Sequence, residues 1–343
     1  MSDVEPTGIA VLGAADIAWR RTIPALLGCP RLRLVAVASR TPEKARAFAD
    51  RFGCEAVTGY ERLLARDDIA AVYIPLPNAL HEAWAEAALR AGKHVLVEKS
   101  LTVSTAAAQH LARLARERGL AFMENFAFLH HPQHQRVRDL VAEGALGTPR
   151  VLTASFGIPR ADPALIRYSV PLAGGALRET GCYPLRAAQL FLGDGLDVLG
   201  ARLGYDEDGG CDMSGSVLLA DDTGLTAQCD FGLDHAYRNT YALWGSEGRV
   251  EVDWAFTPPP GRPTLLRLRR GEHTEDITVP AADQFLRAVT AFAEACADPA
   301  ARAPHAADAV RQATVLATVL DRAGAPAPAR PEPAATRRSH VPG

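Results

Sequence analysis

Residues 92–101, GKHVLVEKSL, decide how the first half of this chain folds. The short apolar run 95–97 lies between a glycine and the charged pair Glu98-Lys99, which is typical of a buried parallel strand. Open α/β sheets bind ligands at the carboxyl ends of their strands, where this pair would lie. A lysine there can be partly desolvated, and it can donate a proton or hold a carbonyl oxygen. The alternative is a lysine that extends past the strand end into solvent.

Strands and helices alternate at short spacing around this stretch. Strands are predicted at 8–13, 33–38, 70–77, 94–100 and 120–126. Helices are predicted between them at 17–27 and 42–53, in a segment ending at 91, and at 104–118. This alternation is typical of a doubly wound parallel sheet, the Rossmann arrangement.

The turn after the first strand has the form of a dinucleotide-binding turn. In the pattern G-x-G-x-x-G/A, Gly13 takes the first position, Ala15 the second and Ala18 the third. Glycine allows the tight turn, and alanine is accepted at the third position. Alanine at the second position keeps a pyrophosphate slightly further from the backbone. The N-terminus of the following helix would face an anion.

The end of the second strand, Ser39-Arg40-Thr41, predicts which dinucleotide binds. An acidic residue here would hold the ribose 2′-hydroxyl of NAD, and none is present. Serine and arginine suit a 2′-phosphate, with Arg40 stacked on adenine or forked onto the phosphate. We therefore expect NADPH/NADP as the cofactor. The alternative is an arginine on a solvated loop.

The second half of the chain is predicted to be strand-rich between about 150 and 280, with turn signals such as 222–224 and little helix. It should form a mostly antiparallel sheet, followed by helices at 283–297 and 305–323. We expect three parts: a dinucleotide-binding domain (1–124), an α+β domain for substrate binding and oligomerisation (125–323), and a disordered tail (324–343) rich in Pro and Ala.

Composition narrows the class of protein. A length of 343 residues suits two domains, and a net charge of −3 gives no reason to expect a nucleic-acid partner. We find no run of 18 apolar residues and no signal peptide at the N-terminus, so neither a membrane partner nor secretion is expected. Six scattered cysteines without a C-x-x-C pair fit reduced thiols, and we expect a cytoplasmic protein.

Three histidines, His130, His131 and His134, could suggest a metal site. No acidic or cysteine ligand lies at ligand spacing, and Pro132 interrupts the run. We expect a polar pocket wall there and no bound metal.

Together these residues resemble the Gfo/Idh/MocA oxidoreductases. The resemblance rests on Glu98-Lys99, the lead-in 92–95, Pro77-Asn78 with His81, and the segment from 174–177 to Tyr183. A closer similarity is to the NADPH-dependent sugar-nucleotide 3-ketoreductases of deoxysugar biosynthesis. It rests on ADIAWRR (15–21), MENFAFLHHPQH (123–134), IRY (166–168), CYPLRAA (182–188) and DHAYRN (234–239). Three positions depart from the usual family residues, namely Ala173 for glycine, Ser100 for proline and Glu179 for aspartate.

The resemblance implies a Rossmann domain joined to an α+β domain with a large open sheet, whose back commonly forms an oligomer interface. A homodimer or homotetramer is therefore expected. The implied activity is the reduction of a keto group, at C-3, of a nucleotide-linked deoxysugar, with dTDP as the expected nucleotide. Lys99, Tyr183 or both would protonate the product alkoxide, because both groups ordinarily hold their protons at neutral pH.

The resemblance also implies the binding residues. The cofactor residues are Gly13, Ala14, Ala15, Asp16, Ile17, Trp19, Arg20, Arg21, Ser39, Arg40, Thr41, Tyr60, Leu76, Asn78, His81, Glu98 and Arg167. The substrate residues are His130, His235, Tyr237 and Asn239.

Two other functions stay open. The protein could be an NAD(P)-dependent dehydrogenase of a free sugar, polyol or inositol. Those family branches commonly carry a histidine near the position of Tyr183 and an acidic residue where Ser39-Arg40 stands. It could also be a nicotinamide-binding sensor or scaffold, although intact Lys99 and Tyr183 count against this.

Overall fold

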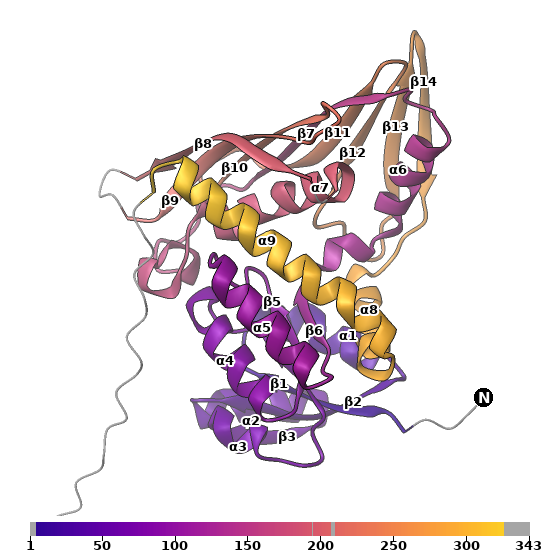
Figure 1. The fold of residues 1–343 in the computed structure, drawn as a ribbon. Coiled ribbons are helices and arrows are strands. Elements are labelled where there is room, and N and C mark those ends of the chain that lie inside the picture. The colour runs from indigo at the N-terminus through magenta and orange to yellow at the C-terminus, as the bar shows by residue number, and fades with distance from the viewer. Residues whose placement is uncertain (1–4, 194, 207–209, 326–343) are drawn as a thin grey trace, which may run out of the picture.

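The first half of the chain folds into a parallel sheet, as the alternation of strands and helices predicts. The computed structural model describes residues 5–193, 195–206 and 210–325 (Figure 1). Six strands lie in the order β3-β2-β1-β4-β5-β6, with every neighbouring pair parallel. They are β1 (Thr7–Leu12), β2 (Leu32–Ser39), β3 (Glu55–Thr58), β4 (Ala71–Ile74), β5 (His94–Glu98) and β6 (Phe122–Asn125). The predicted Rossmann arrangement is confirmed.

Helices connect these strands on both faces of the sheet. They are η1 (Ala18–Thr22), α1 (Ile23–Leu27), α2 (Pro42–Phe52), α3 (Tyr60–Leu64), α4 (Asn78–Arg90) and α5 (Thr105–Glu117). The helix predicted at 17–27 is a π-helical turn, η1, continued by the short α1. The sequence prediction missed β3 and α3, because elements of four and five residues are too short to show a period.

The strand order reverses between β1 and β4, and this is the switch point where such sheets bind ligands. Gly13 follows β1 there with φ of +125°. A Cβ atom on Gly13 would lie 2.7 Å from the side chain of Leu76, which follows β4. Glycine is therefore required at this turn by both its dihedral angle and its close neighbour.

The second half forms an eight-stranded sheet in the order β14-β13-β12-β11-β7-β10-β9-β8. Its strands are β7 (Pro149–Gly157), β8 (Asp197–Tyr205), β9 (Asp212–Ala220), β10 (Thr226–Gly232), β11 (Arg238–Gly245), β12 (Arg249–Asp253), β13 (Thr264–Arg270) and β14 (His273–Val279). Neighbouring strands are antiparallel except β7 and β10, so the predicted mostly antiparallel sheet is confirmed. The sequence prediction missed β14, which is polar and largely exposed.

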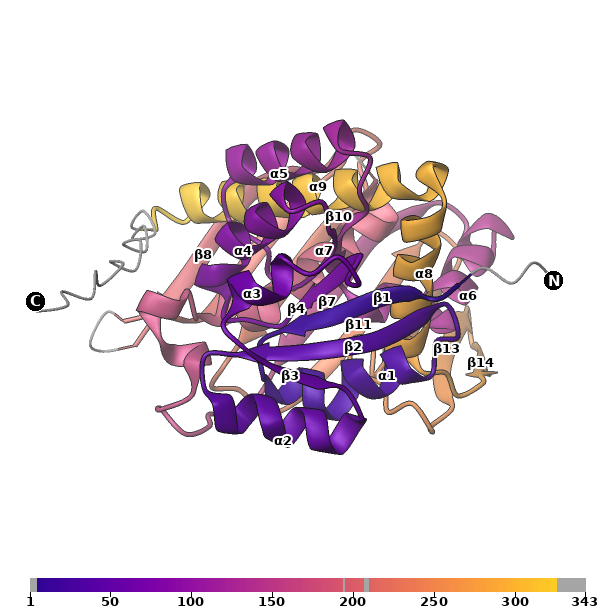
Figure 2. The ribbon, with the colours of Figure 1, turned by 90° about the horizontal axis from the view of Figure 1, so that it is seen from below.

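Helices cover one face of this sheet and lie between it and the first sheet (Figures 1 and 2). The longer ones are α6 (Pro132–Ala142), α7 (Cys182–Leu192) and α9 (Arg302–Arg322), whereas α8 (Gln284–Ala297) packs against α1 and the first sheet. Short helical turns are η2 (Ala127–His130), η3 (Ile166–Tyr168), η4 (Val170–Leu172), η5 (Leu177–Gly181) and η6 (Pro299–Ala301). The predictions of α8 and α9 are close to the observed bounds, whereas α7 was not predicted.

The two C-terminal helices pack on the first sheet. Val289 and Phe292 of α8 share a buried cluster with Ile9 and Val11 of β1. Ala309 and Ala313 of α9 join the cluster on the other face, which contains α5 side chains. The first sheet thus has a core that the C-terminal part of the chain completes, and the linear division at 124 stays a prediction. Residues 326–343 of the predicted tail lie outside the described residues.

No helix within the described ranges combines the length and the apolar character needed to cross a bilayer.

We predict that Phe292→Ala destabilises the protein by about 3–5 kcal/mol, because the ring is fully buried between α8 and the first sheet. Leu27→Ala is the matched control, since Leu27 is 54% exposed and its loss should change the free energy of unfolding by less than about 0.5 kcal/mol. Urea denaturation measures both variants. Equal, small effects would contradict the packing of α8 on this sheet.

Candidate active site

A cleft of about 660 Å³ lies where the carboxyl ends of the parallel strands face the second half of the chain. Both halves contribute to its walls. Among the residues of the first half that line it are Ala15, Asp16, Ile17, Arg20, Arg21, Leu76, Asn78, Glu98 and Lys99. Among those of the second half are Arg167, Glu179, Tyr183, Phe256, Thr257 and Phe285. This volume is in the range of ordinary ligand pockets.

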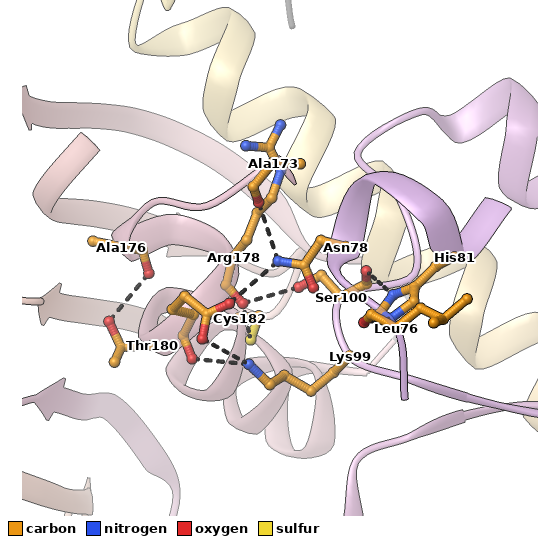
Figure 3. A network of polar contacts seen from close by, with 11 residues as sticks. Leu76, Asn78, His81, Lys99, Ser100, Ala173, Ala176, Arg178, Thr180 and Cys182 are labelled. Carbon is orange, nitrogen blue, oxygen red and sulfur yellow. Dashed lines mark hydrogen bonds and ion pairs between the residues drawn. The ribbon is translucent and has the colours of Figure 1, made fainter. Parts of the chain in front are cut away.

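Lys99 follows β5 directly, and its side chain crosses to the second half of the chain (Figure 3). Its Nζ donates a hydrogen bond to the carbonyl oxygen of Glu179 at 3.2 Å. The same nitrogen lies 3.7 Å from Glu179 Oε2. Burial has the largest single effect and lowers the pKa of Lys99, but Glu179 and, after it, Tyr183, Cys182 and Glu98 together outweigh burial and leave the pKa above its usual value. Lys99 is therefore an ammonium group at neutral pH.

Glu179 is held by a tight turn before α7. A Cβ atom on Gly175 would lie 2.1 Å from Asp212 Oδ1, and one on Gly174 would lie 2.4 Å from the Arg167 carbonyl oxygen. Because Gly175 carries no side chain, Asp212 approaches closely and accepts a hydrogen bond from the Leu177 N–H at 2.6 Å. The two glycines thus allow η5 to begin at a position that brings Glu179 to the cleft.

Ala173 occupies the place of a family glycine and has φ of +58°. This left-handed conformation explains why glycine is usual there. The Ala173 carbonyl oxygen accepts a hydrogen bond from Asn78 Nδ2 at 3.1 Å, and the same amide lies 3.3 Å from Glu179 Oε1 (Figure 3). Asn78, at the start of α4, therefore joins the first half of the chain to the turn that carries Glu179.

Tyr183 lies on the first turn of α7, and its ring is 5.4 Å from Lys99 Nζ. Phe126 and Phe156 pack against it edge-on, with ring centroids at 5.8 and 5.2 Å. Burial raises the pKa of Tyr183, and the positive charge of Lys99 opposes this rise in part. The phenol is therefore protonated at neutral pH. Two proton donors, one from each half of the chain, thus line one cleft.

Glu98 is the buried end of a chain of hydrogen bonds. Its Oε1 accepts bonds from the Tyr73 hydroxyl and from Asn125 Nδ2, each at 2.7 Å. Thr22 Oγ1 donates to the Tyr73 hydroxyl at 2.9 Å. Burial raises the pKa of Glu98, and these donors oppose the rise. Glu98 and Asn125 pair in register at the ends of adjacent strands, so both side chains reach the cleft wall.

Two family models match the chain. Residues 7–126 match the oxidoreductase family with an NAD-binding Rossmann fold, and residues 134–251 match the GFO/IDH/MocA C-terminal domain. The chain belongs to the Gfo/Idh/MocA oxidoreductase family. The resemblance seen in the sequence is therefore confirmed.

Similar proteins within this family are named as reductases of one sugar nucleotide. The chain is 53% identical to the dTDP-3,4-didehydro-2,6-dideoxy-alpha-D-glucose 3-reductase of Streptomyces violaceoruber, over 84% of each chain. It is 46% identical to the enzyme of that name from Actinomadura kijaniata, over 93% of this chain and 96% of the other. A crystal structure of KijD10, a 3-ketoreductase from Actinomadura kijaniata in complex with NADP and TDP-benzene, superposes with a TM-score of 0.90 at 46% identity. The match covers 93% of this chain and 98% of KijD10.

Most of the family's cofactor residues predicted above lie at the cleft or at the strand ends beside it. Gly13 and Ala14 form the turn after β1. Arg20 is paired with Asp16. Ser39 is buried at the end of β2, and its Oγ accepts a hydrogen bond from the Thr41 N–H at 3.1 Å.

Arg40 is exposed beside Tyr60. Burial raises the pKa of that phenol, and the charge of Arg40 opposes the rise. This neighbourhood places a cation at the strand end where a 2′-phosphate is expected.

Two of the predicted cofactor residues have other contacts. The Trp19 ring packs on Phe48 and Phe52, with ring centroids at 4.8 and 5.4 Å, and Arg51 lies 4.3 Å above it. His81 is buried between two carbonyl oxygens, those of Leu76 at 2.6 Å and Ser100 at 2.9 Å. His81 therefore joins the loop after β4 to the loop after β5.

The four predicted substrate residues do not gather in the cleft. His130 lines a separate cavity, and His235 lies over Gly157 and Gly232 at the edge of a hollow on the second sheet. Their binding role stays a prediction. The resemblance to the family grouped these residues, and the structure places them around different hollows.

Asn239 and Tyr237 form hydrogen bonds with Phe256 and Thr257, two residues that line the cleft. Asn239 Nδ2 donates to Thr257 Oγ1 at 2.7 Å, and its Oδ1 accepts from the Phe256 N–H at 2.8 Å. The Tyr237 hydroxyl lies 3.2 Å from the same Thr257 oxygen. Both side chains therefore fix the position of Phe256 and Thr257, which line the cleft.

Sequence reasoning missed Tyr73, Thr22 and Asn125 as site residues. The signal for Tyr73 was a hydroxyl in the middle of a buried apolar strand, which requires a hydrogen-bond partner. The signal for Asn125 was its place at the end of the strand next to Glu98.

Two of the three histidines at 130–134 have hydrogen-bond partners of their own. His134 Nδ1 lies 2.9 Å from the Tyr241 hydroxyl, and His131 Nδ1 accepts a bond from the Gln133 N–H at 3.3 Å. In the part of the chain that the structure describes, no group of three or more His, Cys, Asp or Glu side chains is placed to hold a metal. The expectation of a metal-free protein stays a prediction.

Proposed function

We propose that this protein is an NADPH-dependent reductase that acts on the C-3 keto group of a dTDP-linked deoxysugar. The observation that carries the proposal is the pair Lys99 and Tyr183, two protonated groups side by side in a cleft at the carboxyl ends of the parallel strands. The names of the similar reductases support the substrate class. The NADP and TDP-benzene complex of KijD10 supports both the cofactor and the nucleotide.

The residues present fit a dinucleotide. The turn at Gly13 leaves a space that a Cβ atom could not share with Leu76, and the N-terminus of η1 follows it. Ser39 and Arg40 would hold a 2′-phosphate, since no carboxylate stands at the end of β2. Bound NADPH would supply the hydride. Glu98 and Asn125 line the wall beside Lys99 and would fix the orientation of a ring placed there.

In this mechanism the keto carbon accepts a hydride, and the carbonyl oxygen becomes an alkoxide. The Lys99 ammonium group donates its proton to that oxygen and becomes a neutral amine. Glu179 keeps Lys99 charged until that step, because its carboxylate opposes the effect of burial. The Tyr183 hydroxyl donates a hydrogen bond to the same oxygen and orients the carbonyl.

We also propose that the protein is a homo-oligomer joined through the open face of the second sheet. Four strands of that sheet carry large apolar side chains that are exposed, namely Leu199, Leu218, Trp244 and Leu265. Apolar patches of this kind are typical of subunit interfaces. The cytoplasmic location and the division at residues 124 and 323 remain our predictions.

The substrate class is tested by NADPH oxidation against a panel of dTDP-linked keto sugars, free keto sugars and inositol-type ketones. We expect turnover with dTDP-linked 3-keto sugars and a new hydroxyl group at C-3 in the product, identified by NMR. Turnover of free sugars alone would support a polyol or sugar dehydrogenase. NADPH binding without any turnover would support a sensor or scaffold.

We predict that Arg40→Ala weakens NADPH binding about 5- to 150-fold, the equivalent of about 1–3 kcal/mol for a charge-assisted hydrogen bond. NADH binding should hardly change, because NADH has no 2′-phosphate. Titration of both cofactors measures this, and Arg46→Ala, an exposed arginine on α2, is the control. Equal losses for both cofactors would show that Arg40 does not bind the 2′-phosphate.

We predict that Lys99→Met lowers kcat by roughly 10²–10⁴-fold, the contribution of a general acid, while NADPH still binds. Methionine keeps much of the aliphatic stem, so packing is largely preserved. Tyr183→Phe should lower kcat by less, because it removes one hydrogen bond to the reacting oxygen, worth about 0.5–1.5 kcal/mol. Near wild-type turnover by Lys99→Met beside an inactive Tyr183→Phe would make the tyrosine the proton donor.

A further inference from the structure

A second cavity, of about 310 Å³, lies beside the end of β6. Glu124 and Phe126 line this cavity, whereas Asn125 and Ala127 line the cleft. Met123, which precedes Glu124 on β6, lines the cavity as well, so the end of this strand contributes residues to both spaces. The cavity shares no lining residue with the cleft, so it is a separate site.

The walls of this cavity are rich in cationic side chains. Arg138 of α6, Arg186 of α7 and Arg311 of α9 line it, together with the carboxylates of Glu124 and Asp308. Asp308 is shared, because it pairs with both Arg186 and Arg311. Burial raises the pKa of Glu124 to about 7, so this carboxyl is only partly ionised at neutral pH. Among the described residues that line the cavity, the guanidinium groups of three arginines therefore lie beside the carboxyl groups of Asp308 and Glu124.

The two histidines of the cavity add no charge at neutral pH. Burial lowers the pKa of His130 to about 4, with His305 and Arg287 as further causes. Burial also lowers the pKa of His305. Both imidazoles line the cavity as neutral groups that can donate or accept hydrogen bonds.

The floor of the cavity is held in place by buried hydrogen bonds. Arg186 is 6% exposed, and its Nη1 donates to Gln189 Oε1 at 2.8 Å. Gln189 Nε2 donates to Gln312 Oε1 at 2.6 Å, and Gln312 Nε2 donates to the Cys182 carbonyl oxygen at 3.0 Å. This chain fixes the Arg186 guanidinium before any ligand arrives.

Glu124 is fixed in a similar way. It is 8% exposed, and its Oε1 accepts a hydrogen bond from the Leu101 N–H at 2.8 Å. At the rim, Arg138 is exposed and Arg311 is partly exposed, so both can reach a ligand that enters from solvent. The cavity therefore combines a rigid, buried cationic floor with a cationic rim.

We propose that this second cavity binds a small anion with two or more negative charges, of the size of inorganic phosphate or a short dicarboxylate. Guanidinium groups suit both, because their planar donors form paired hydrogen bonds with phosphate and carboxylate oxygens. The volume lies at the lower end of the range for ligand pockets and suits a ligand much smaller than a dinucleotide. The inference does not depend on the reaction proposed above.

Isothermal titration with inorganic phosphate and with malonate tests this site. Saturating NADP and TDP fill the main cleft first, because that cleft also binds phosphate groups. We expect one further anion per chain to bind to the wild type. A preference for phosphate or for malonate identifies which of the two chemistries the site takes. If neither anion binds while the cleft is full, the proposal is wrong.

Two variants test whether the anions bind in this second cavity. The rim variant Arg138→Gln/Arg311→Gln should weaken binding about tenfold or more, the loss expected when charge-assisted hydrogen bonds are removed. Arg136→Gln is the control, since Arg136 lies on the same helix, pairs with Glu143 and does not line the cavity. NADP affinity should stay unchanged in both. Equal phosphate or malonate affinities for the rim variant and the control would overturn the assignment.

The variant Glu124→Gln tests whether the cavity binds anions or cations. Glutamine keeps an acceptor for the Leu101 N–H and removes a negative charge from the floor. The anions should therefore bind at least as tightly as to the wild type. Loss of phosphate and malonate binding in this variant would contradict an anion site.

Discussion

The contact between Lys99 and Glu179 is the interaction on which the site depends. The lysine belongs to the end of β5, and the carboxylate belongs to the turn before α7, so the contact exists only when both halves of the chain are folded together. Burial lowers the pKa of Lys99, and the Glu179 carboxylate makes the largest of the contributions that raise it again. The Gly174-Gly175 pair and Asn78 hold that carboxylate at the cleft. Together these contacts keep Lys99 protonated in a cleft that is partly shielded from solvent.

Packing of the C-terminal helices keeps the two halves in this relation. α8 completes the core on one face of the first sheet, and α9 joins the core on the other face. Because these C-terminal helices return to the first sheet, side chains from both halves of the chain are buried together in its core. The cleft is therefore formed by the fold itself, in keeping with the preformed pockets of most enzymes.

Much of this organisation was predictable from the sequence, because buried parallel strands are short apolar runs that end at glycines or charges. The strand before Glu98-Lys99, the Gly13 turn and the family were all read from such patterns. Polar, exposed β14 and the short β3 carry no such pattern and were missed. Trp19 and His235 were assigned to binding by the resemblance to the family, and their binding roles stay predictions. The contacts of Trp19 with Phe48 and of His235 with two glycines could not be predicted, because side-chain direction depends on the backbone path, which a motif does not give.

The most direct test of the Lys99–Glu179 contact is the pH dependence of single-turnover hydride transfer in the wild type and in Glu179→Gln. A general acid must be protonated, so its rate falls as the pH rises through its pKa. Glu179 holds the pKa of Lys99 above its usual value. We therefore predict a wild-type rate that is constant from about pH 6 to about pH 10, near the ordinary lysine pKa. Without the carboxylate, burial lowers the pKa, and the rate of Glu179→Gln should fall at a clearly lower pH. Identical pH profiles for the two proteins would contradict the role given to this contact.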